Sequence, residues 1–265
     1  MHAVINGGSL AFDDHGNGPA VVLIHGFPLC RRMWRPQIAP LTAAGYRVVV
    51  PDLRGFGESA PPDGACTMEL YADDIAGLLD HLEIDRAVVA GMSMGGYVLF
   101  NLLERHADRL AAACFVVTRS AADDMAGKAR RLRMARRAAA DGAGAVVRHF
   151  GTALFAPRTA QERPELVAEV RSWISGSDPR GLAGGLLAMR ERKDYTPFLE
   201  GIHLPCLAVG AEDDRAVPVE NARELAAAIP GCRLAIVPDA GHMANMERPA
   251  AFNDAVIAFL REVCP

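Results

Sequence analysis

A serine between two glycines is the feature of this chain that most clearly points to chemistry. The sequence Gly-Met-Ser-Met-Gly at residues 91–95 follows an apolar run at 87–90 and precedes a segment of helical character at 97–106. In the order strand, sharp turn and helix, Gly-x-Ser-x-Gly presents a serine hydroxyl above the edge of a sheet. Side chains two residues before and after the serine would collide with the crossing backbone, which explains both glycines. We therefore predict that Ser93 is a nucleophile.

A serine hydroxyl needs a base to remove its proton, and histidine suits this role because it titrates near neutral pH. His242 is our candidate, since it lies in a loop between a strand-like run at 234–237 and the last helical segment at 249–261. Loops at the carboxyl edge of a doubly wound sheet lie over one crevice, so His242 can meet Ser93 despite their separation in sequence.

An acid must hold the histidine in the correct tautomer and orientation. The loop after the apolar run at 206–209 offers Asp213 and Asp214, and both fit the chain order serine, aspartate, histidine. The residues themselves leave this choice open.

Acyl transfer also requires preorganised backbone donors for a tetrahedral oxyanion. One is the N–H of Met94, directly after the serine, and we expect the other in the loop that leaves the first apolar strand at 20–24. Gly26 lets the backbone turn there, and the N–H of Phe27 can point inward. We expect His25 to brace this loop rather than to act in catalysis.

Apolar runs alternate with helical periods along most of the chain, which predicts a doubly wound, mostly parallel sheet of about eight strands, covered on both faces. The strands located from sequence are residues 20–24, 47–50, 87–90, 111–117, 206–209 and 234–237. The predicted helices are residues 34–44, 67–82, 97–106, 219–229 and 249–261.

Residues 119–195 interrupt this alternation, are rich in charge and show helical rather than strand character. We predict a helical lid over 119–195, inserted into a core domain formed by 1–118 and 196–265. Its apolar underside has six candidate residues: Phe150, Leu154, Phe155, Trp173, Leu186 and Met189.

The lid contains a basic run at 128–137. We interpret it as the solvated face of a helix, as charge runs on helices usually are. The alternative is a surface that attracts an anionic substrate, a coenzyme A thioester or an acidic partner.

Composition narrows the class of protein. A chain of 265 residues with 51% hydrophobic content suits one α/β domain with an insertion. The net charge of −4 gives no overall attraction to nucleic acid. We find neither an uncharged stretch of the ~18 residues that a membrane span needs nor the layout of a signal peptide, and we expect a cytoplasmic protein without membrane contact. The six cysteines lack metal-binding spacing, and we expect no metal and no cofactor.

Four segments, taken together and in this order, resemble the α/β-hydrolase superfamily. They are His-Gly-Phe-Pro at 25–28, Pro-Asp-Leu-Arg-Gly-Phe-Gly-Glu-Ser at 51–59, Gly-Met-Ser-Met-Gly-Gly at 91–96 and Ala-Gly-His at 240–242. The resemblance covers nearly the whole chain and is strongest to small serine hydrolases with one lid, namely carboxylesterases, 3-oxoadipate enol-lactonases and cofactor-free haloperoxidases. It implies an α/β-hydrolase fold with a triad of Ser93, His242 and an aspartate, and with Phe27 and Met94 as oxyanion donors.

The resemblance also bears on which aspartate is the acid. The family's usual distances from the proline that leads the strand and from the proline of the loop, here Pro205 and Pro218, both select Asp214. The spacing Gly-x-x-Asp counted from Gly210 selects Asp213 instead. Two landmarks against one favour Asp214, and we predict that it completes the triad.

Two further pairs of residues admit more than one role. Asp52 and Arg54 could bind substrate, but the resemblance implies that they brace the loop after the strand at 47–50. Met33 and Trp34 either line an acyl pocket or pack beneath the lid.

These residues predict a serine hydrolase that transfers the acyl group of a small-molecule carboxylic ester, thioester or lactone to water through an acyl-enzyme. The alternatives are a cofactor-free haloperoxidase or perhydrolase, a hydrolase of carbon–carbon bonds, and, outside enzymology, a receptor or signalling module on the same fold. The complete set of triad and oxyanion residues argues against the last, although a fold alone does not prove function. The sequence leaves the oligomeric state open.

Overall fold

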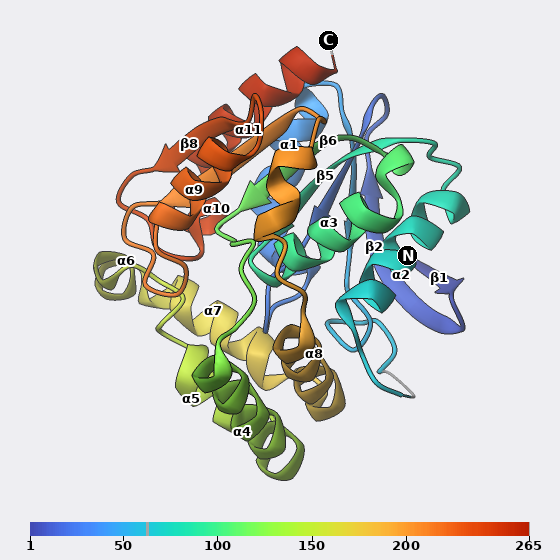
Figure 1. The fold of residues 1–265 in the computed structure, drawn as a ribbon. Coiled ribbons are helices and arrows are strands. Elements are labelled where there is room, and N and C mark those ends of the chain that lie inside the picture. The colour runs from blue at the N-terminus through green and yellow to red at the C-terminus, as the bar shows by residue number, and fades with distance from the viewer. Residues whose placement is uncertain (62–63, 265) are drawn as a thin grey trace.

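Eight strands form one sheet in the computed structural model, which describes residues 1–61 and 64–264 (Figure 1). The strands are β1 (His2–Ile5), β2 (Gly8–His15), β3 (Ala20–Ile24), β4 (Arg47–Pro51), β5 (Ala87–Met92), β6 (Leu110–Val116), β7 (Cys206–Ala211) and β8 (Arg233–Val237). Their order in the sheet is β1-β2-β4-β3-β5-β6-β7-β8. The pairs β1–β2 and β2–β4 are antiparallel and the other pairs are parallel, which confirms the predicted fold class.

The β1–β2 hairpin is the part of the sheet that we did not locate from sequence. Its two-residue turn is Asn6-Gly7, and both residues have positive φ, 46° and 74°. An Asn-Gly turn of this kind matches the right-handed twist of two antiparallel strands. The signal was therefore present in the sequence, but the short strands beside it lack a long apolar run.

The helices follow the predicted segments closely. They are η1 (Arg31–Trp34), α1 (Arg35–Ala43), α2 (Met68–His81), α3 (Met94–Arg105), η2 (Ala107–Arg109), α4 (Met125–Asp141), α5 (Gly144–Phe150), α6 (Pro157–Glu162), α7 (Pro164–Ser175), α8 (Pro179–Glu191), η3 (Thr196–Gly201), α9 (Glu220–Ala228), α10 (Ala244–Glu247) and α11 (Pro249–Val263). Only α3 begins clearly earlier than predicted, because it starts directly after Ser93.

Helices cover both faces of the central sheet. Every residue of β3, β5 and β7 is buried, which accounts for their continuous apolar sequences. Helix α1 packs against α11, and α2 packs against α3. Within residues 1–61 and 64–264, no helix combines the length and the apolar composition that crossing a bilayer requires.

Helices α4 to α8 lie between β6 and β7 in the chain, and they gather at the end of the molecule opposite the C-terminus (Figure 1). Residues 119–195 contain helices and no strand, as their sequence indicated. Helix α4 packs along α8, and these are the two longest helices of the insertion.

The cysteines form no disulfide. Cys114 and Cys206 are buried in adjacent strands, whereas Cys232 is half-buried. Burial raises the pKa of Cys206 to about 12 and that of Cys232 to about 11. These thiols therefore stay protonated at neutral pH and are poor nucleophiles.

A buried ion pair ties the hairpin to the helical layer. Arg54 donates to both oxygens of Asp74, from Nε at 2.9 Å and from Nη2 at 2.7 Å, and its Nη2 also donates to the carbonyl of Ile5 at 3.1 Å. The Asp74 side chain is completely buried. Arg54 therefore braces the loop after β4 against α2 and β1, as the resemblance implied.

We predict that Asp74→Asn lowers the free energy of unfolding by about 3 kcal/mol, because it leaves the Arg54 guanidinium buried without a counter-charge. Asp80→Asn is the matched control on the same helix, since Asp80 pairs with Arg109 but its side chain is 69% exposed. We expect the control to change stability by less than about 1 kcal/mol. Urea unfolding followed by circular dichroism measures both, and equal losses would contradict the prediction.

Candidate active site

Ser93 occupies a sharp turn between β5 and α3, with φ 52° and ψ −109°. A non-glycine residue rarely adopts positive φ, and such a conformation persists only where the surroundings impose it. The Ser93 N–H donates to the carbonyl of Val116 at 2.9 Å, and the hydroxyl of Thr118 donates to the Ser93 carbonyl at 2.8 Å. Strand β6 and the residues after it therefore hold both peptide groups that flank Ser93.

The glycines around Ser93 are required by close backbone packing, as the sequence predicted. A Cβ on Gly91 would lie 2.2 Å from the carbonyl oxygen of Gly95, and a Cβ on Gly95 would lie 2.5 Å from that of Ile24. Both distances are far below van der Waals contact. The elbow can thus form only where neither position carries a side chain.

The histidine and one of the two candidate aspartates are in direct contact. Nδ1 of His242 lies 2.7 Å from Oδ2 of Asp214, and both residues are buried. Oδ1 of Asp214 accepts the N–H groups of Ala216 at 2.8 Å and Val217 at 2.9 Å. These donors fix the carboxylate, so Nδ1–H of the imidazole donates to it and Nε2 remains available as a proton acceptor.

Asp213 lies elsewhere. It is exposed, and its backbone N–H donates to the carbonyl of Ala240 at 2.8 Å. The residue still contributes to the site, because this bond joins its loop to the loop of His242. Its side chain, however, has no contact with the imidazole among the hydrogen bonds of the described residues.

Ser93, His242 and Phe27 line one small cavity of about 100 Å³. They come from three loops, after β5, β8 and β3, which parallel strands bring to the same edge of the sheet. Met94 is the first residue of α3, and N–H groups in the first turn of a helix have no acceptor within it. The site therefore combines a hydroxyl, an imidazole held by a carboxylate, and backbone donors beside the hydroxyl.

Sequence reasoning missed Glu247, which connects the histidine loop to the helical insertion. Its carboxylate accepts the N–H of Gly241 at 3.0 Å and the N–H of Ala156 at 3.0 Å, and the residue is 2% exposed. Burial raises the pKa of Glu247, although the backbone donors act in the opposite direction. Nothing in the spacing of the sequence marks this residue, because the segment that it contacts lies some ninety positions away.

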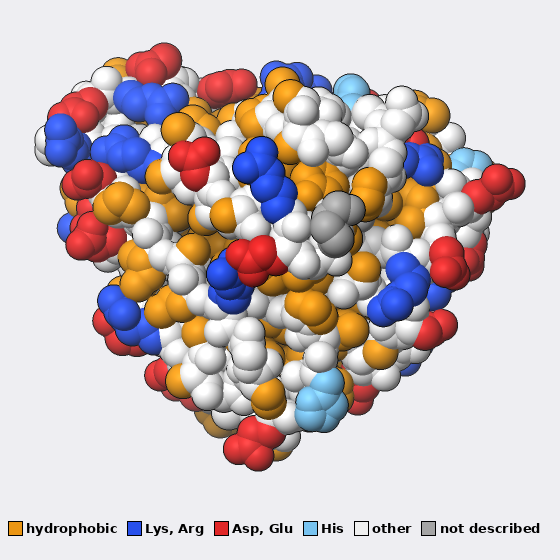
Figure 2. Space-filling view, turned by 90° about the horizontal axis from the view of Figure 1, so that it is seen from above, with side chains coloured by type: hydrophobic (Ala, Val, Ile, Leu, Met, Phe, Trp, Pro, Cys, Tyr) orange, Lys and Arg blue, Asp and Glu red, His pale blue; other side chains and the backbone are white. Residues whose placement is uncertain are grey.

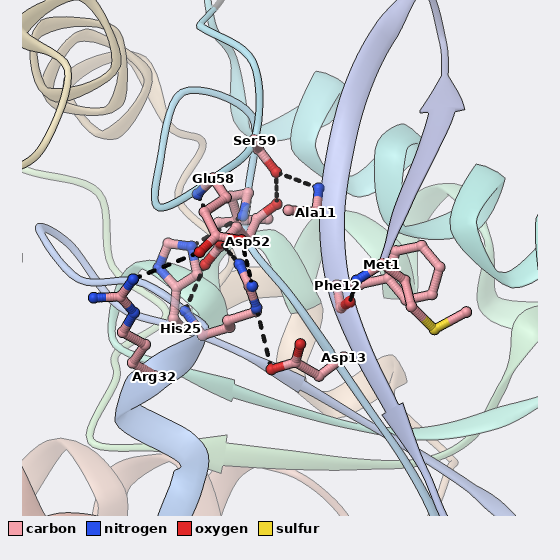
Figure 3. A network of polar contacts seen from close by, with 11 residues as sticks. Met1, Ala11, Phe12, Asp13, His25, Arg32, Asp52, Glu58 and Ser59 are labelled. Carbon is pink, nitrogen blue, oxygen red and sulfur yellow. Dashed lines mark hydrogen bonds and ion pairs between the residues drawn. The ribbon is translucent and has the colours of Figure 1, made fainter.

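Asp52 and His25 brace the loops around the site, and Figure 3 shows Asp52 at the centre of this network. The Asp52 carboxylate accepts the N–H of Arg31 at 2.6 Å and of Glu58 at 2.9 Å, and it also pairs with the Arg31 guanidinium. Nε2 of His25 accepts the N–H of Leu53 at 3.0 Å. Burial lowers the pKa of His25, so the ring is neutral and can accept. Both residues have structural roles, as expected.

Met33 and Trp34 are fully buried and do not line the cavity that contains Ser93. The Trp34 ring packs against Phe252 at a centroid distance of 5.9 Å. This contact is with helix α11 and not with residues 119–195, so it shows packing, but against the C-terminal helix rather than beneath the insertion.

A larger cavity of about 620 Å³ adjoins the small one, and the two share Arg119, Arg131, Phe150, Leu154 and Ala216 in their walls. Its volume falls in the range of small-molecule sites. Five of the six predicted apolar residues of the insertion line one or both cavities: Phe150, Leu154, Phe155, Leu186 and Met189. The sixth, Trp173, packs against the core and lines neither.

Comparison with known proteins identifies a matching family and several similar solved structures. A family model described as the alpha/beta hydrolase fold matches residues 19–249. An esterase from Thermogutta terrifontis, solved with malate bound, is 37% identical, with a TM-score of 0.96 over 100% of this chain and 99% of the other. The enol-lactonase from Burkholderia xenovorans LB400 is 32% identical, with a TM-score of 0.92 over 98% and 100% of the two chains. A bromoperoxidase from Bacillus anthracis is 27% identical, with a TM-score of 0.88 over 98% and 99%.

We predict that Gly91→Ala destabilises the protein by about 1–3 kcal/mol, because the added Cβ must displace the backbone of Gly95. Gly201→Ala serves as the control, since a Cβ at Gly201 meets no atom within 4 Å. Chemical denaturation measures the free energy of unfolding of each variant. Similar values for the two variants would contradict the close approach in the elbow.

Proposed function

The chain is an enzyme of the α/β-hydrolase family, and on that premise we propose that it is a serine hydrolase of carboxylic esters, thioesters or lactones. The observation that carries this proposal is the contact of Asp214 with His242 beside the cavity that His242 shares with Ser93. An oriented imidazole next to a serine in a strained elbow is the arrangement that activates a hydroxyl for acyl transfer.

In the proposed mechanism, Nε2 of His242 takes the proton of the Ser93 hydroxyl as its oxygen attacks the substrate carbonyl. Asp214 stabilises the imidazolium that forms. The N–H groups of Phe27 and Met94 donate to the oxyanion, and the positive end of the α3 dipole adds to this stabilisation. His242 then gives its proton to the leaving group, and water releases the acyl group from Ser93 by the same steps in reverse order.

We also propose that residues 119–195 act as a lid over a core domain of residues 1–118 and 196–265. The small cavity lies where this insertion meets Ser93 and His242, and the larger one lies where it meets Arg215 and Ala216 of the loop after β7. Its apolar residues exclude water from the reacting atoms, which strengthens every electrostatic interaction in the site. The hydrocarbon portion of the substrate then contacts these apolar residues of the lid.

A second candidate is peroxide-dependent chemistry on the same triad, with peroxide in place of water as the acceptor of the acyl group. The likeness to the bromoperoxidase from Bacillus anthracis favours this candidate. Halogenation assays with hydrogen peroxide and a short carboxylic acid distinguish it from ester hydrolysis.

We predict that a fluorophosphonate probe labels the wild-type protein at neutral pH and that Ser93→Ala abolishes this labelling, because the probe reacts with an activated serine hydroxyl. Labelling is read by gel fluorescence and by mass spectrometry of the modified peptide. Ser59→Ala is the control, since Ser59 is a buried serine that hydrogen-bonds to Asp52 and lies outside both cavities. A wild-type protein that does not react would refute the serine hydrolase proposal.

We predict that Asp214→Asn lowers kcat for an activated ester by about 10³- to 10⁴-fold, because an amide no longer stabilises the imidazolium and favours the wrong tautomer. Asp213→Asn is the matched control in the adjacent position, with an exposed side chain. We expect it to change kcat by less than about threefold, which on the activation scale is under 1 kcal/mol. A larger loss in Asp213→Asn would assign the acid to that residue instead.

A further inference from the structure

Positive charge is concentrated at the two cavities. Arg119 and Arg131 line both of them, and Arg130 and Arg215 line the larger one. Among the residues that the structure describes, no aspartate or glutamate contributes to either wall. The chain as a whole is negative, with a net charge of −4, and the end that carries the C-terminus shows charges of both signs interspersed (Figure 2). The excess of positive charge is thus a local property of the site.

A single carboxylate, that of Asp123, holds three guanidinium groups. It accepts from Arg119 Nη2 at 2.7 Å and from Arg192 Nη2 at 2.9 Å, and it pairs with Arg131 through Nε. Burial acts to raise the pKa of Asp123, but the guanidinium groups of Arg192 and Arg131 outweigh it and keep the carboxyl ionised. Three cations against one anion leave the cluster with two uncompensated positive charges.

Arg192 is the arginine of this cluster whose contacts lie within the protein. Its side chain is 2% exposed, lies over the Tyr97 ring at 4.3 Å and donates to the carbonyls of Met189 and Ala121. Arg192 and Asp123 therefore form a fixed pair. The other two arginines are attached to this pair but face the cavities.

Arg119 and Arg131 retain donor groups that the protein does not use fully. Nε of Arg119 is buried and has no hydrogen-bond partner within the described part of the chain. Nη1 of Arg131 lies 3.2 Å from the sulfur of Met189, which is a weak acceptor. Partly buried cations with unused donors are costly unless an anion completes their hydrogen bonds. A bound substrate can supply that anion.

We propose that the acyl portion of the substrate ends in a carboxylate, which binds to Arg119 and Arg131. This inference rests on the serine hydrolase function proposed above. Both arginines line the small cavity that contains Ser93, where the acyl group remains after the first step, as well as the larger cavity, so an acyl chain that extends from Ser93 can reach them with its carboxylate. A guanidinium and a carboxylate form short, charge-assisted hydrogen bonds, which gives the site a fixed acyl orientation.

The test compares monoethyl esters of succinate, glutarate and adipate with the ethyl esters of the corresponding monoamides, which have the same shape without the charge. Release of ethanol gives kcat/KM for each ester. For the best chain length, we expect the wild type to favour the carboxylate over the amide by about 10- to 100-fold, in line with hydrogen bonds between charged groups. Added sodium chloride should reduce this ratio, because it screens the partly exposed arginines.

In Arg131→Gln, the ratio of kcat/KM for the carboxylate ester to that for the amide ester should fall toward one. In Arg131→Lys, we expect a ratio between that of Arg131→Gln and that of the wild type. Arg136→Gln is the matched control, since Arg136 belongs to the same helix α4, is exposed and lines neither cavity. We expect this control to retain the wild-type ratio. Because a ratio of two substrates is measured in one variant, a general loss of active enzyme does not affect it.

A second measurement does not depend on any variant. Glutarate should inhibit hydrolysis of a neutral ester by the wild type competitively, and at least about tenfold more strongly than glutaramide. Equal rates for carboxylate and amide esters, together with equal inhibition by the two acyl analogues, would overturn this inference and leave the hydrolase function intact. An equal loss of the ratio in Arg136→Gln would also overturn it, because the general charge of α4 would then be the cause. Failure of the fluorophosphonate to label the wild type would instead refute the serine hydrolase function on which this inference rests.

Discussion

The backbone of Ser93 has a positive φ, which is unfavourable for a non-glycine residue and typically costs about 1–3 kcal/mol. Contacts with the neighbouring strands hold Ser93 in this conformation. The Val116 carbonyl accepts the Ser93 N–H, Thr118 donates to the Ser93 carbonyl, and Gly95 lies against the carbonyl of Ile24. The position of the hydroxyl is thus fixed by β3, β5 and β6 together. The loops that carry the other residues of the site must therefore bring them to this fixed position.

The residues that complete the site are held in the same way, by bonds between loops rather than by their own helices. Asp213 donates to the Ala240 carbonyl, which joins the acid loop to the histidine loop. Glu247 extends this connection to Ala156 of the insertion. The insertion is therefore linked to the loop of His242 in two ways, through the Glu247 carboxylate and through the N–H of Met243, which donates to the carbonyl of Leu154 at 3.1 Å.

Features that depend on local sequence could be predicted, and features that depend on distant partners could not. The apolar runs of the buried strands and the glycines of the elbow identify the fold and Ser93, because burial on both faces and backbone crowding each leave a direct mark on residue type. The choice between Asp213 and Asp214 turns on which side chain faces inward, and the decisive bonds come from Ala216 and Val217 in the following turn. No neighbouring residue in the sequence indicates the role of Glu247, because one of its partners, Ala156, lies far away in the chain.

The basic run of α4 illustrates this limit best. The run of charge predicts a solvated face, and Arg136 and Arg137 are indeed exposed and line neither cavity, but Arg131 on the same helix lies in the wall of the site. Arg131 turns inward because it pairs with Asp123, which precedes α4 and is itself held by Arg192, which follows α8.

The two ends of the insertion thus meet at one carboxylate. Because that carboxylate balances only one of three cations, the same contact that closes the insertion also leaves positive charge at the cavity that contains Ser93. Anchoring the insertion and selecting an anionic acyl group are in this way two consequences of one cluster, and a change that relieves the charge would also loosen the connection.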